Sequence, residues 1–118
     1  MSESNFIGTV EISPTAISSI AGQAVLESYG VVGLAPRYFR NGIHDIFPRS
    51  LFRRGVDVHV VNGEIKIDLY VVVEYGTRIS EVAHGVMNRV KYTVEQAVGL
   101  PVAEVNVHVQ GLRVSSDS

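Results

Sequence analysis

The clearest pattern in the chain is a pair of alternating apolar and polar runs on either side of Asn62-Gly63. Both residues of this dipeptide tolerate positive φ, and flanked by alternating residues it is a strong marker of a β-hairpin. A two-residue turn gives apolar pairs on one face: Val56 with Leu69, Val58 with Ile67, and Val60 with Ile65. The opposite face carries Asp57, His59, Lys66 and Asp68, with Asp57 opposite Asp68. The pattern therefore predicts a hairpin with one buried face and one face that is solvated or covered by a partner.

Two segments repeat apolar residues at the spacing of a helix. The first follows Ser13-Pro14, where the serine hydroxyl can cap free amides and proline suits the first helical position, and Gly30 marks its end. The second runs from Ser80 to Val98, and Gly99 and Pro101 stop it. Its predicted apolar stripe comprises Val82, Ala83, Val86, Met87, Val90, Val94 and Ala97. Gly22 and Gly85 lie inside these helices, and we expect them to mark close packing.

Short apolar segments at Phe6–Ile12, Val31–Ala35 and Val102–Gln110 complete the set of predicted strands. Together the elements predict an α+β fold, a two-layer sandwich in which two helices cover one face of a mixed or antiparallel sheet. We expect a single domain over residues 1–112 and a disordered tail over residues 113–118.

Composition excludes several classes of site. The chain has 118 residues and no cysteine, which rules out disulfides, a thiolate nucleophile and a cysteine-ligated zinc site. The net charge of -2 argues against a dedicated nucleic-acid binder, and RNA recognition on the sheet would have little beyond Tyr70 for base stacking. The N-terminus shows no signal-peptide pattern, and no apolar run approaches the ~20 residues of a membrane span. We therefore expect a cytoplasmic protein.

Residues 36–54 interrupt the pattern of strands and helices. This stretch holds five of the ten basic residues, only one acid, and several aromatics, a mixture enriched at protein interfaces. The candidate partner-binding residues are Arg37, Tyr38, Phe39, Arg40, Phe47, Arg49, Phe52, Arg53 and Arg54. Two alternatives stay open: a loop over the core whose arginines are merely solvated, and a basic amphipathic stretch that touches an anionic membrane surface.

Two further groups of residues are candidates for ligand chemistry. His59, His108, Asp57 and Asp68 have outward parity on their strands and would suit a metal if those strands were neighbours; otherwise they form an ordinary solvated face. Gly76, Thr77 and Arg78 precede the second helix, where free amides and an arginine can bind an anion; a plain strand-to-helix turn explains them equally well. The sequence contains no phosphate loop and no nucleophile elbow, so no catalytic residue or cofactor is predicted.

An ordered series of segments resembles the alkaline shock, or Gls-type general stress, protein family. The segments are Gly8–Pro14, Tyr29–Leu34, Gly55–Val58, Ile67–Gly76, Val90–Val94 and Val105–Gly111. The resemblance implies a short family member with a role in cell-envelope stress or homeostasis, no established catalytic residues, and self-association. It also implies a protein partner. This partner is either a membrane-anchored protein, which would place the chain near the membrane, or a protein with a dihydroxyacetone-kinase-like domain.

These observations lead to a non-enzymatic scaffold or adaptor that acts through self-association and protein contacts. The alternative is a module that senses a small ligand or phosphate, through the turn from Gly76 to Arg78 or through the outer sheet face.

Overall fold

A four-stranded sheet and two helices form the part of the chain that the structure, a computed structural model, describes: residues 11–35 and 55–114. In chain order the elements are α1 (Pro14–Leu26), β1 (Val31–Leu34), β2 (Val56–Val61), β3 (Glu64–Glu74), α2 (Ile79–Val98) and β4 (Val102–Arg113). Strands β1 and β2 pair antiparallel with β3, and β4 pairs parallel with it. The predicted α+β fold is confirmed, and its sheet is mixed.

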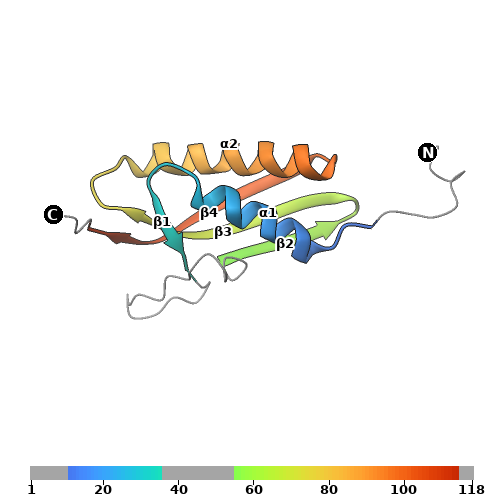
Figure 1. The fold of residues 1–118 in the computed structure, drawn as a ribbon, viewed down its shortest axis with the longest axis horizontal. Helices are drawn as coiled ribbons and strands as arrows, with labels where there is room; N and C mark the ends of the chain where they lie inside the picture. The colour runs from blue at the N-terminus through green and yellow to red at the C-terminus, as the bar shows by residue number, and fades with distance from the viewer. Residues whose placement is uncertain (1–10, 36–54, 115–118) are drawn as a thin grey trace, which may run out of the picture.

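Strand β3 is the centre of the sheet. Strand β4 runs along nearly the whole length of β3, from Ile65 to Glu74, so β1 and β2 share the other edge of β3 end to end. Parallel neighbours need a long connection between them, and α2 supplies it by crossing from the end of β3 to the start of β4 (Figure 1).

Both helices cover the same face of the sheet, and the core lies between the two layers. Helix α1 packs on β1 and β2, α2 packs on β4, and the two helices contact each other. Alternate residues of β3 are almost completely buried beneath them: Ile65, Ile67, Leu69, Val71 and Val73. The buried stripe of α2 comprises Val82, Val86, Val90 and Val94, as predicted, whereas Ala97 is exposed and does not belong to it.

The predicted helix boundaries are close to the observed ones. Ser13 caps α1, because its Oγ accepts a hydrogen bond of 3.1 Å from the amide of Ala16. Helix α1 ends at Leu26, and Gly30 adopts a positive φ of 87° in the turn that follows. Helix α2 ends where Gly99 adopts φ 78° and its amide donates to the carbonyl of Glu95.

The hairpin has the predicted register at every pair. Val56 faces Leu69, Val58 faces Ile67, and Asp57 faces Asp68. Asn62 and Gly63 both adopt positive φ, at 54° and 78°, as a type I′ turn requires.

Three sequence-based expectations differ from the structure. Strand β4 continues beyond Gln110 to Arg113, because Glu74 of β3 supplies a partner for Arg113, so the predicted tail begins too early. The predicted strand Phe6–Ile12 lies mostly outside the described residues, and Ile12 itself is in no strand. A Cβ added at Gly85 would meet nothing within 4 Å, so the expected close packing at that glycine is wrong.

No helix in residues 11–35 and 55–114 is long and apolar enough to cross a membrane.

Candidate functional site

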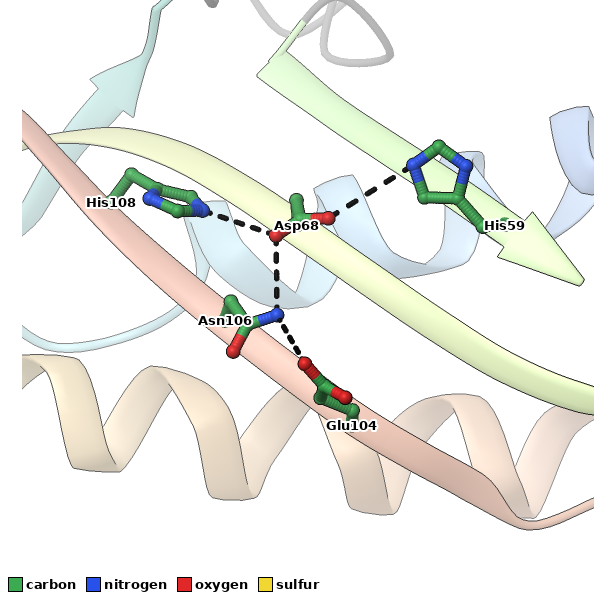
Figure 2. Close-up of polar contacts among 5 residues, drawn as sticks. All are labelled: His59, Asp68, Glu104, Asn106 and His108. Carbon is green, nitrogen blue, oxygen red and sulfur yellow. Dashed lines mark hydrogen bonds and ion pairs between the residues drawn. The ribbon is translucent and has the colours of Figure 1, made fainter.

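The outer face of the sheet, opposite the helices, gathers polar side chains from three adjacent strands. We call His59 of β2, Asp68 of β3, and Glu104, Asn106 and His108 of β4 the outer-face cluster (Figure 2). Alternation along each strand directs these residues away from the core, and the pairing of β2, β3 and β4 brings them side by side.

Asp68 is the centre of the outer-face cluster. Its Oδ1 lies 3.1 Å from Nε2 of His108 and accepts a hydrogen bond of 3.2 Å from Nδ2 of Asn106. Its Oδ2 lies 4.0 Å from Nε2 of His59. The same amide of Asn106 also donates to Oε2 of Glu104 at 2.8 Å. The cluster is therefore connected across all three strands, and Figure 2 shows both histidines directed at the one carboxylate.

The ring of His108 is held from a second direction. It stacks on the ring of Tyr70, with centroids 4.6 Å apart and an interplanar angle of 12°. Tyr70 is only 9% exposed, so it forms a fixed support beneath the more exposed histidine. Its burial also removes the aromatic that RNA stacking on this face would have used.

The environment of Asp68 lowers its pKa below the ordinary value of 3.8. Partial burial works to raise this pKa, because it disfavours the charged form, but the hydrogen bonds from His108 and Asn106 and the nearby charges of His108 and His59 outweigh burial. The carboxylate is thus maintained as an acceptor between two potential cations.

This lowered pKa predicts that protonating Asp68 destabilises the fold. Because the folded-state pKa lies below the unfolded one, the ionised group contributes stability above pH 3.8 that is lost as the pH falls through the folded-state value. We expect Asp68→Asn to be less stable than the wild type at neutral pH, and the difference between them to shrink as the pH falls below that range. Urea unfolding followed at a series of pH values measures this, and a difference independent of pH would contradict it.

Within the described residues the geometry does not support the metal hypothesis. Two of the four predicted residues, His59 and His108, meet at Asp68, and Asp57 lies opposite Asp68 in the strand register. However, no group of three or more such side chains within the described residues is arranged to hold a metal ion. What the cluster offers is a fixed set of hydrogen-bond donors and acceptors.

The three predicted anion-binding residues line a cavity of about 520 Å³ at one end of the molecule, which we call the end cavity. Gly76, Thr77 and Arg78 form one wall. The remaining lining comes from the turn that follows α1 and from the first half of α2: Glu27, Ser28, Tyr29, Glu81, Val82, Gly85 and Arg89.

Glutamates already engage both arginines of the end cavity. Arg78 pairs with Glu81 at 2.9 Å, and Arg89 pairs with Glu27 at 2.9 Å. The hydroxyl of Thr77 donates to the carbonyl of Glu74 at 2.7 Å. An anion entering the cavity would therefore compete with carboxylates that are already in place.

The predicted partner-binding residues, from Arg37 to Arg54, lie outside the described residues. They stay a sequence-based hypothesis. Sequence reasoning found the outward parity of the outer-face cluster but missed the roles of Asn106 and Glu104, for which only their alternation with valines gave a signal.

Comparison with known proteins places the chain in a family. Residues 2–114 match the model of the alkaline shock protein 23 family, described as having a cell envelope-related function. The uncharacterised protein YloU of Bacillus subtilis is 46% identical over 110 residues, which cover 92% of each chain. A stress response regulator gls24 homologue of Streptococcus pyogenes is 26% identical, over 90% of this chain and 59% of its own length.

Among solved structures, a variant of MamM superposes with a TM-score of 0.52 and 17% identity, over 86% of this chain and 99% of that one. This likeness concerns the fold alone.

Proposed function

Because the chain belongs to the alkaline shock protein 23 family, whose description is cell envelope-related, we propose that it is a non-enzymatic adaptor of envelope homeostasis that binds protein partners and itself. The two relatives named above are called an uncharacterised protein and a stress response regulator homologue, and neither name indicates catalysis.

The observation that carries this proposal is the outer sheet face, which neither helix covers. Hydrogen bonds already join its polar side chains on β3 and β4, and His59 of β2 lies 4.0 Å from Asp68, so binding would order few side chains. The outward positions of β2, β3 and β4 carry five carboxylates against two basic side chains: Asp57, Glu64, Asp68, Glu74 and Glu104 against Lys66 and Arg113. We therefore propose a protein partner with a basic, hydrogen-bonding contact surface.

Affinity capture from native lysate, with soluble and membrane fractions kept apart, tests the proposal. The critical bait is His59→Ala combined with His108→Ala, which removes both histidines and leaves Asp68 bonded to Asn106. We expect this bait to lose a protein that the wild type retains. His84→Ala is the matched control, since His84 is exposed on α2. Equal retention by all three baits would remove the outer face from the proposal.

A further bait in the same experiment tests the arginine-rich stretch of residues 36–54. A bait with Arg49→Glu, Arg53→Glu and Arg54→Glu tests whether the arginine-rich stretch holds the partner instead. The resemblance to the family suggests a membrane-anchored protein or a protein with a dihydroxyacetone-kinase-like domain as that partner. Loss in this bait alone would assign recognition to the segment, and no captured protein with any bait would contradict the adaptor function.

A second candidate function is binding of a small anion in the end cavity, favoured by the position of Gly76, Thr77 and Arg78 on its wall. Titration with inorganic phosphate would give heat and a raised melting temperature in the wild type. Arg78→Ala would lose both. Absence of heat and of a melting shift in the wild type would eliminate phosphate as the ligand.

A further inference from the structure

Strand β4 leaves one long edge of the sheet without a neighbouring strand among the described residues. It pairs with β3 on one side only, and it is 12 residues long (Figure 1). Soluble monomers usually protect such edges with lysine, proline or inward-pointing charges, because free backbone amides and carbonyls attract further strands. Strand β4 contains no lysine or proline, and its only formal charges are Glu104 and Arg113.

Apolar side chains of the core are also partly exposed to solvent along this edge. Val105, Val107 and Val109 of β4 face the helices but are only partly buried. The residues that they pair with on β3, namely Ile67, Leu69 and Val71, are 0% exposed. A strand added beside β4 would cover the exposed flank of these three valines.

Only part of the edge is both regular and open. Side chains of α2 already cover Val102, whose carbonyl accepts from Nζ of Lys91 at 3.2 Å and whose amide donates to Oε2 of Glu95 at 2.8 Å. The β3–β4 ladder is irregular at residues 103 and 110. Bulges of this kind end strand addition, so the regular stretch available to another strand is residues 104–109.

The sequence of this stretch is self-complementary about Asn106. An antiparallel second copy centred on Asn106 would place Glu104 opposite His108 of that copy, twice by symmetry. Val105 would lie opposite Val107 on the helix side. Acid would thus face histidine on the outer face and valine would face valine on the inner face, which are favourable cross-strand pairs.

We propose that residues 104–108 of β4 pair antiparallel with the same residues of a second copy, about a two-fold axis at Asn106. The sheet then continues through both copies, the open flanks of Val105 and Val107 are covered, and the two outer-face clusters lie on one continuous surface. This inference rests on the self-association in the proposed function and names the surface that performs it.

Site-specific cross-linking tests the interface directly, because the chain contains no cysteine. Directly opposite residues of antiparallel strands have Cα atoms about 4.5–5.5 Å apart, within the range that a disulfide spans. Asn106→Cys is therefore expected to form a disulfide-linked dimer under mild oxidation. Gln96→Cys, exposed on α2, is the control and is expected to stay unlinked. Linking of both variants alike, or of the control alone, would overturn the interface.

A second pair of variants tests the interface without cysteines, by measuring dimerisation directly. Val107→Lys places a charge on the edge strand, and sedimentation equilibrium is expected to show dimerisation weakened by roughly tenfold or more. Gln96→Lys adds the same charge on the exposed face of α2 and is expected to dimerise like the wild type. Circular dichroism of each variant establishes that it is folded.

The outcomes separate this inference from the adaptor function. A wild type that is monomeric by sedimentation overturns both the edge pairing and self-association. Whether the chain binds another protein is then decided by the lysate capture alone. A dimer that Val107→Lys does not weaken overturns the edge pairing alone. A dimer linked through Asn106→Cys supports the edge pairing even where lysate capture retains no partner.

Discussion

Leu69→Ala is expected to lower the free energy of unfolding by about 2–5 kcal/mol. Leu69 is 0% exposed on the central strand, where it faces Val56 on β2 and Val107 on β4. Removing its branched end leaves a cavity beneath both helices that three strands border, and the β-sheet cannot easily collapse to fill it. Urea unfolding followed by circular dichroism measures the loss.

The control for this change is Val60→Ala on the same hairpin. Val60 is 48% exposed near the turn, so its truncation removes little buried surface and is expected to cost well under about 1 kcal/mol. Comparable losses for the two variants would show that Leu69 is not at the centre of the core.

Alanine at two glycines is expected to change stability in opposite directions. At Gly30 the new Cβ would lie 2.6 Å from Cγ2 of Val82, and φ is +87°, a region that alanine disfavours. Strain and overpacking together are expected to cost about 2 kcal/mol or more.

At Gly85 the same methyl meets nothing within 4 Å on a regular helix, so alanine is expected to stabilise the protein by about 0.5–1 kcal/mol. Thermal unfolding of both variants beside the wild type gives the signs. If Gly85→Ala destabilises as Gly30→Ala does, the open space beside Gly85 is not as the structure has it.

The hairpin and the helices were predictable because their signals are local. Asn62-Gly63 fixes the turn, and the turn together with period-two alternation fixes each cross-strand pair, including Asp57 with Asp68. Gly99 and Pro101 stop α2 by the backbone preferences of single residues. Such features depend on neighbours in the sequence rather than on the assembled fold.

The outer-face cluster was predictable only in outline. Parity places His59, Asp68 and His108 outward, but it does not say which strands are neighbours. Parallel pairing of β3 with β4 brings Asp68 and His108 together from positions 40 residues apart, and that pairing depends on α2 packing across the sheet. Long-range packing of this kind leaves no local signal.

The end cavity shows the same limit of sequence-based prediction, although here a local signal does exist. The turn from Gly76 to Arg78 carries a local signal for anion binding, and the structure does place it on a cavity wall. Yet Arg89 is occupied by Glu27, a residue 62 positions away, and Arg78 by Glu81. The charge balance that decides the chemistry of the cavity therefore emerges only after the two helices have packed.

Photo-cross-linking in living cells tests most directly whether the outer sheet face is the surface that binds a partner. A photoreactive amino acid is placed at His59, which is exposed beside Asp68, and in a second strain at Gln96, exposed on α2. If the outer face binds, irradiation gives a covalent adduct of defined higher mass from position 59 and none from position 96. Adducts from position 96 alone, or from neither position, would contradict an adaptor that works through its outer sheet face.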